Sequence, residues 1–93
     1  MIKVIWSDTA VKDLDHIYAY IAFDSEVYAR ALIAEILLSV ERIEKFPKSG
    51  RIVPEIGQEN SREIFLGNYR IIYEIKGKAI HILTVIHGAR KLK

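Results

Sequence analysis

The sequence contains no cysteine, only two prolines and one tryptophan, and no long apolar run. Without cysteine there can be no disulfide and no thiolate metal site, and nothing calls for an oxidising compartment. No apolar stretch approaches the roughly 18 to 20 residues that cross a bilayer, and residues 1–4 lack a signal-peptide profile. We therefore expect a soluble, cytoplasmic protein that does not bind membranes.

Common catalytic and metal-binding motifs are also missing. The chain has no glycine-rich phosphate loop and no Gly-x-Ser-x-Gly string. His16, His81 and His87 lack carboxylate or cysteine companions at ligand spacing, so we expect no metal site and no cofactor. Half of the residues are apolar, and 93 residues have room for one domain, residues 1–93.

Positive charge is concentrated in the second half of the chain. Residues 1–46 carry five Lys/Arg and eight Asp/Glu, whereas residues 47–93 carry nine and four. The two halves therefore have net charges of −3 and +5. A basic half indicates a surface that meets an anion, either nucleic acid or an acidic protein segment, and an ordinary solvated surface is the alternative.

The first half of the chain predicts one strand and two helices. Residues 2–6 are β-branched and aromatic, and Ser7-Asp8-Thr9 supplies a strand stop and a helix N-cap. From residue 10 to residue 21 the apolar positions recur at the 3-4-3 spacing of one helical stripe. Asp24-Ser25 provides a second N-cap, and a second helix is expected over residues 27–46, where Pro47 ends it.

The second half predicts one loop and three strands. Residues 47–61 hold both prolines and two of the five glycines, so we expect a long loop. Loops of this length inside a compact domain are often functional. Strands are expected over residues 62–66, 69–75 and 79–86, joined by Gly67-Asn68 and Gly77-Lys78. The predicted fold is α+β with the order β-α-α-β-β-β: an antiparallel sheet of about four strands with a helical hairpin packed on one face.

The relative positions of two strand arginines depend on the register of the first hairpin. With two-residue turns, Arg70 lies opposite Phe65 and Val85, while Arg62 lies on the other face of the sheet. The face of Arg70 then also carries Ile72, Glu74, His81 and His87. A three-residue loop would shift the register by one and bring Arg62 and Arg70 onto one face, and the sequence does not distinguish the two.

The candidates for binding a nucleic acid or a target protein are Arg51, Arg62, Arg70 and Arg90. Arg70 lies inside an apolar run, so it either forms a structural ion pair with Glu63 or Glu74 or grips a phosphate. Solvent exposure is the alternative for Arg51 and Arg62. His87 could transfer protons in RNA cleavage while Arg90 holds the scissile phosphate, and a structural or partner-contacting histidine is the alternative.

Several strings, in their order and spacing, resemble the RelE/ParE superfamily of toxins. They are Asp13-Leu14 through Ile17 and Tyr20-Ile21, residues 46–51 (FPKSGR), Arg62-Glu63, residues 67–74 (GNYRIIYE) and residues 82–90 (ILTVIHGAR). The resemblance covers nearly the whole chain. It implies the toxin of a type II toxin–antitoxin module, of the plasmid stabilisation type, which arrests growth and is neutralised by a cognate antitoxin.

The resemblance implies two alternative activities. RelE-like relatives are ribosome-dependent endoribonucleases that cleave mRNA with basic residues on the sheet, whereas ParE-like relatives inhibit DNA gyrase and are not known as nucleases. By position, Arg62, Arg70 and Arg90 resemble three of the RelE-type catalytic residues, and His87 could serve as a fourth. Ile64 and Phe65 stand where a second lysine would be expected, and no tyrosine follows the last strand. This slightly favours the ParE-like activity, and an inactive toxin-like domain that only binds a partner is a further alternative.

Either toxin activity implies an antitoxin partner and a toxin–antitoxin hetero-oligomer. The antitoxin is expected to be a small protein with an acidic or amphipathic C-terminal segment that folds on binding. Leu38, Ala31 and Ala34 extend the apolar surface of the second helix further round than one sheet face needs. These residues either pack against the first helix or form a partly exposed groove that an antitoxin helix covers.

Overall fold

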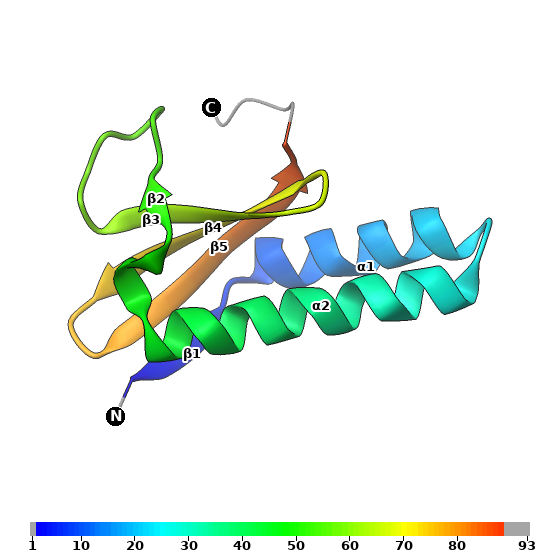
Figure 1. Ribbon diagram of the computed structural model, residues 1–93, viewed down its shortest axis with the longest axis horizontal. Coiled ribbons are helices and arrows are strands. Elements are labelled where there is room, and N and C mark those ends of the chain that lie inside the picture. The colour runs from blue at the N-terminus through cyan, green and yellow to red at the C-terminus, as the bar shows by residue number, and fades with distance from the viewer. Residues whose placement is uncertain (1, 89–93) are drawn as a thin grey trace.

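The computed structural model describes residues 2–88, and every predicted helix and strand is present (Figure 1). The elements are β1 (Lys3–Trp6), α1 (Asp8–Ala22), α2 (Glu26–Lys45), the 3-10 turn η1 (Pro47–Ser49), β2 (Arg51–Ile52), β3 (Ser61–Leu66), β4 (Tyr69–Lys76) and β5 (Ala79–His87). Arg90, one of the predicted site residues, lies outside the described residues.

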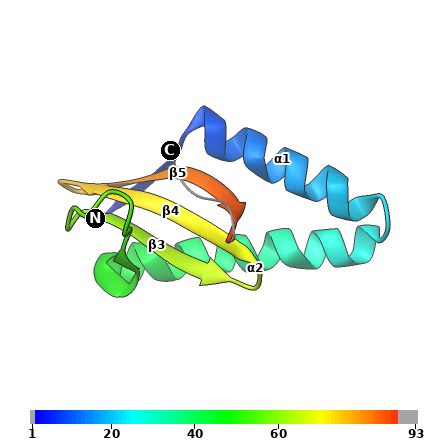
Figure 2. The same ribbon diagram turned by 90° about the horizontal axis from the view of Figure 1, so that it is seen from above.

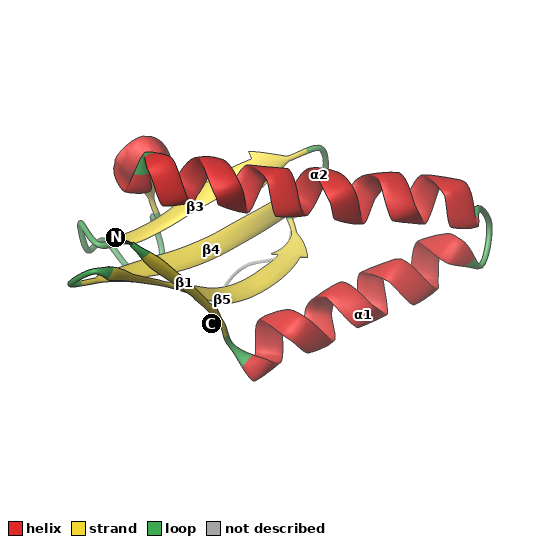
Figure 3. Cartoon of the chain, turned by 90° about the horizontal axis from the view of Figure 1, so that it is seen from below, coloured by secondary structure: helices red, strands yellow, loops and turns green. Residues whose placement is uncertain are grey.

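The strands form one sheet in the order β1-β5-β4-β3-β2. The two helices pack as a hairpin on one face of this sheet, and we call the opposite face the open face (Figure 2 and Figure 3). The predicted α+β fold is confirmed, with two differences in detail. The pairing of β1 with β5 is parallel, and a short fifth strand, β2, lies inside the segment 47–61 that was expected to be a loop.

Local sequence signals explain where the helices begin and end. The Ser7 hydroxyl accepts a hydrogen bond from the Ala10 N–H at 3.0 Å, and the Ser25 hydroxyl accepts one from the Tyr28 N–H at 3.1 Å. Both serines therefore act as the predicted N-caps. Pro47 follows the end of α2 and starts η1. Within residues 2–88, neither helix is both long and apolar enough to cross a membrane.

The core lies between α2 and the helix-facing side of the sheet. Ile36, Val40 and Ile43 of α2 are buried against Ile71 and Tyr73, together with residues of β5. The outer side of α2 is different. Ala31, Ala34 and Leu38 are exposed, and Leu37 is 45% exposed. The apolar surface of α2 is therefore wider than the fold itself uses.

A β-bulge in β5 interrupts its pairing with β4. Ile72 pairs with Thr84, whereas Tyr73 pairs with Ile82, so that Leu83 is an extra residue on β5. Two residues from the other end of the chain hold this bulge. The Ser7 hydroxyl donates to the Leu83 carbonyl at 2.8 Å, and the Asp13 carboxylate accepts from the Val85 N–H at 2.9 Å. The bulge is thus fixed by the residues that follow β1, at the point where α1 begins to pack against β5.

The bulge changes which residues share a face with Arg70. The first hairpin has the two-residue turn, so Arg70 pairs with Phe65, and Arg62 lies on the opposite face. The predicted pairing of Arg70 with Val85 is wrong, because the extra residue makes Ile86 its partner. His81 still shares the face of Arg70, but His87 pairs with Tyr69 on the helix-facing side. The prediction that Arg70 and His87 share a face is therefore also wrong.

Replacing Asp13 with alanine is expected to destabilise the fold. The substitution removes the acceptor of the Val85 N–H, which should cost about 1–3 kcal/mol in the free energy of unfolding measured with urea. Asp15→Ala, at an exposed position of the same helix, is the matched control. Equal stabilities of the two variants would contradict the role of Asp13 in holding the bulge.

Candidate functional site

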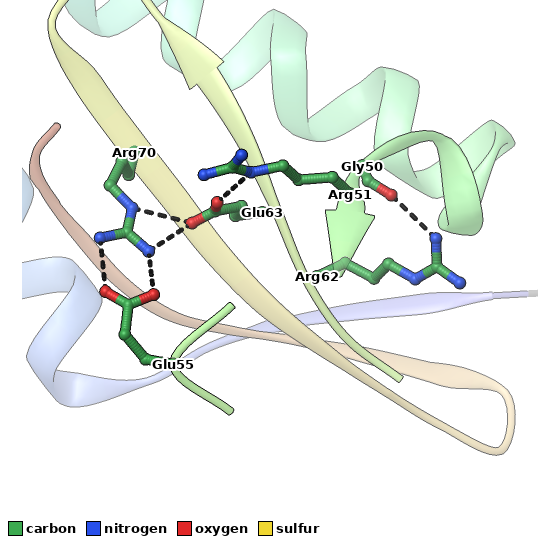
Figure 4. Close-up of polar contacts among 6 residues, drawn as sticks. All are labelled: Gly50, Arg51, Glu55, Arg62, Glu63 and Arg70. Carbon is green, nitrogen blue, oxygen red and sulfur yellow. Dashed lines mark hydrogen bonds and ion pairs between the residues drawn. The ribbon is translucent and has the colours of Figure 1, made fainter. Parts of the chain in front are cut away.

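Arg51 and Arg70 are the predicted site residues that the structure brings together. They lie on the open face, where β2, β3 and β4 are side by side (Figure 4). The segment that follows β2 folds back over this face and brings Glu55 to Arg70. Arg51, Glu55, Glu63 and Arg70 form a connected set that we call the Arg/Glu cluster. Among the described residues of the open face, only this cluster joins two of the predicted arginines to a common partner, which is Glu63.

Arg70 is at the centre of the Arg/Glu cluster and is only 4% exposed. Its Nη1 and Nη2 atoms each donate to one carboxylate oxygen of Glu55, at 3.0 Å and 3.0 Å, which is a bidentate pairing. Its Nε atom donates to Oε1 of Glu63 at 2.8 Å. Arg70 is therefore a buried member of an ion-pair network, as one of its two predicted roles requires, and both carboxylates hold it in place.

Glu63 links the two arginines of the cluster. Its side chain is 0% exposed, with Oε1 accepting from Arg70 and Oε2 accepting from Nε of Arg51 at 2.5 Å. Arg51 is different, because 59% of its side chain is exposed and its guanidinium lies 5.1 Å from the centre of the Phe65 ring. Arg51 is thus the one member of the cluster that presents much of its cationic side chain to solvent.

Electrostatics keep Arg70 charged inside this site. The hydrogen bond to Glu55 raises the pKa of Arg70 above its ordinary value, burial opposes this, and Glu63 raises it further. Two arginines and two glutamates make the cluster neutral overall. A neutral and internally bonded cluster is poorly suited to binding a phosphate, because the phosphate would have to displace a carboxylate that is already in place.

Arg62 has a structural environment of its own on the other face. Its Nε atom donates to the Glu59 carbonyl at 2.7 Å. Its Nη1 atom donates to the Gly50 carbonyl at 2.9 Å (Figure 4). Its side chain is only 13% exposed. Arg62 therefore links the start of β2 to the start of β3, and the alternative that this residue is exposed to solvent is wrong.

Tyr73 and Gly50 form a buried contact that the sequence did not indicate. The Tyr73 hydroxyl donates to the Pro47 carbonyl at 2.6 Å and accepts from the Gly50 N–H at 3.1 Å. A side chain at Gly50 would meet this hydroxyl and the Glu63 carbonyl, since a Cβ atom there would lie 2.7 Å and 2.6 Å from them. Burial raises the pKa of Tyr73, while the Gly50 N–H and the charge of Arg62 lower it less strongly.

His87 lies apart from the arginines. Its ring makes an edge-to-face contact with Tyr69, with 5.9 Å between the ring centres. Both residues line a cleft of about 360 Å³ between the β3–β4 turn and the far end of the helical hairpin, where Tyr20 and Tyr28 form the other wall. Since Arg70 lies on the open face, the structure does not combine His87 with Arg70 in one site.

The sequence did not predict the partners of Glu55 and Tyr73. Glu55 lies in the segment 47–61, and nothing in its surroundings predicts that it reaches Arg70, because that pairing depends on how the segment folds back. Tyr73 follows an apolar run that predicts burial but no particular partner. Among residues 2–88, no three His, Cys, Asp or Glu side chains are grouped as ligands for a metal ion.

Comparison with known proteins gives a consistent result. Residues 4–92 match the sequence profile of the family described as "ParE toxin of type II toxin-antitoxin system, parDE". The Sinorhizobium fredii protein named "Putative toxin Y4kP" is 34% identical to this chain, over 92% of this chain and 88% of its own length. The structure of the chromosomal ParDE system from P. aeruginosa has a TM-score of 0.76 at 24% identity, covering 94% of this chain and 96% of that one. The RelB–RelE antitoxin–toxin complex from Methanococcus jannaschii has a TM-score of 0.57 at 28% identity, covering 89% and 88%.

Removing Arg70 alone is expected to destabilise the fold strongly. Arg70→Met leaves the Glu63 carboxylate buried without its main partner, which should cost about 3–5 kcal/mol in the free energy of unfolding. The double variant Arg70→Met/Glu63→Met removes both buried charges and should recover much of this loss. Arg51→Met removes the partly exposed partner of Glu63 but leaves Arg70 in place, so it should cost less than Arg70→Met. A double variant that is as unstable as Arg70→Met would contradict this account.

The raised pKa of Tyr73 predicts a pH dependence of stability. A group with a raised pKa in the folded state contributes stability that is present below its unfolded pKa, about 10 for tyrosine, and lost as the pH rises through the folded value. Wild type should therefore lose stability above about pH 10 faster than Tyr73→Phe, measured as urea unfolding across alkaline pH. Parallel pH profiles for the two proteins would argue against the buried hydroxyl as the cause.

Proposed function

This chain belongs to the ParE toxin family of type II toxin–antitoxin systems, and we propose that it arrests growth by inhibiting DNA gyrase without cleaving nucleic acid. One observation carries this proposal. The two described arginines that resemble RelE-type catalytic residues are both bonded within the protein, Arg70 to two carboxylates and Arg62 to backbone carbonyls.

A nuclease of this kind would need those groups for its substrate. Stabilising the transition state of RNA cleavage requires cationic donors aimed at the reacting phosphate and a proton-transfer group within hydrogen-bond reach of it. Arg70 is 4% exposed, and His87 lies across the sheet from it. The described residues therefore do not offer such a constellation on one surface, which supports an inhibitor that acts by binding.

We also propose that an antitoxin covers the outer side of α2 and forms a hetero-oligomer with the toxin. Ala31, Ala34 and Leu38 are exposed at the i, i+3 and i+7 positions of one stripe, which is the pattern that receives an amphipathic partner helix. The similarity to the RelB–RelE antitoxin–toxin complex supports a partner of this type. The basic second half of the chain suits an acidic segment in that partner.

Two assays on a single preparation test the proposed activity. Supercoiling by purified gyrase is expected to fall as the toxin is added, while ribosome-bound mRNA stays intact, because Arg62 and Arg70 are bonded within the protein. His87→Ala serves as the matched variant, since loss of a catalytic histidine would abolish cleavage and leave the fold intact. Cleavage of mRNA by wild type that His87→Ala abolishes would overturn the proposal, as would full supercoiling at saturating toxin.

A further inference from the structure

Three distant segments meet at the end of the molecule where β1 begins. These are the end of α2 with η1, the start of the chain, and the β4–β5 turn (Figure 1 and Figure 3). Between them lies a cleft of about 510 Å³. Its lining residues are Ile2, Lys45, Phe46, Pro47, Lys48, Ser49, Ile75 and Gly77. We call this cleft, with Lys45, Lys48 and Lys78 at its margin, the lysine groove.

The floor of the lysine groove is apolar. Phe46 is 67% exposed, although it is a large aromatic residue, and Ile2, Pro47 and Ile75 beside it are only partly buried. Isolated apolar residues on a surface are ordinary, but several that gather in one hollow are typical of a protein-binding site. The fold itself does not cover this floor.

The rim of the groove is basic. Lys45 and Lys48 line it, and Lys78 follows the lining residue Gly77. Lys3 and Lys76 lie near this end of the molecule, but the strand register places them on the open face, opposite to Ile2 and Ile75. Lys48 pairs with Glu59 at 3.3 Å, whereas Lys45 and Lys78 have no carboxylate within ion-pair distance among the described residues.

Of the two unpaired lysines at the rim, only one has an ordinary explanation. Lys45 lies in the last turn of α2, where a cation complements the helix dipole. Lys78 lies in the β4–β5 turn and has no such reason to be there. The unpaired positive charge beside the apolar floor therefore exceeds what the helix end accounts for.

We propose that the lysine groove binds an acidic protein segment that inserts a large apolar side chain onto the Phe46 floor. A protein partner fits better than a nucleic acid, because protein interfaces combine an apolar centre with a charged rim, whereas nucleic-acid interfaces are polar and wet throughout. The lysines would meet the acidic side chains of the partner and steer its approach. This binding does not depend on gyrase inhibition, so the two can fail separately.

A nuclear magnetic resonance titration of the full chain tests the proposal. The probe is a short capped peptide of glutamate and serine with one central leucine, and saturable shifts of the amide signals of Phe46, Ile75 and Gly77 are expected. Lys45→Glu/Lys78→Glu should weaken binding about tenfold or more, corresponding to roughly 1.4 kcal/mol. Phe46→Ser, which changes an exposed side chain, should also weaken it, whereas Lys12→Glu on the exposed side of α1 should not.

Matched probes separate the proposal from simpler explanations. The same peptide with serine in place of leucine should bind more weakly, and equal binding would overturn the proposal in favour of plain charge attraction. A single-stranded oligonucleotide of equal charge that binds more tightly at the same residues would assign the groove to nucleic acid. Absence of saturable shifts with the leucine peptide would also overturn the proposal, and urea unfolding of each variant shows whether it is folded.

Discussion

The ion pair between Arg70 and Glu63 is the interaction on which the open face of this protein depends. Both side chains are buried on the open face, where each charge needs a partner of opposite sign. Glu55 completes the bonding of Arg70 and so holds the segment after β2 against the sheet. Arg51 completes the bonding of Glu63 and so holds β2 itself. One buried pair thus fixes a segment that would otherwise be a long loop.

The β5 bulge is a second constraint, and it decides which residues can act together. Its extra residue, Leu83, turns the end of β5 so that His87 faces the helices, whereas His81 keeps the face of Arg70. Ser7 and Asp13 hold this arrangement from the start of α1. The separation of His87 from Arg70 is therefore built into the packing of α1 against the sheet, and a simple change of side-chain rotamer would not reverse it.

Sequence reasoning succeeded where the signal is local and failed where it depends on distant partners. The N-caps Ser7 and Ser25, the stop at Pro47 and the Gly67-Asn68 turn each act within a few residues, so the helices and the first hairpin could be predicted. The strand β2 exists only because residues 51 and 52 pair with residues 63 and 62. The bulge depends on contacts across more than 70 residues of sequence, and no local pattern predicts it. The same is true of Glu55, whose role depends on the folded position of its segment.

The distribution of charge shows why counting basic residues is a poor guide to the accessible charge of the surface. The second half of the chain has a net charge of +5, yet Arg62 and Arg70 are bonded within the fold and contribute little accessible charge. Guanidinium groups suit such buried roles because they are weakly hydrated and donate several directed hydrogen bonds. Ammonium groups are strongly hydrated, so lysines stay at the surface. The accessible positive charge of the described residues therefore includes the lysine groove, which lies away from the Arg/Glu cluster.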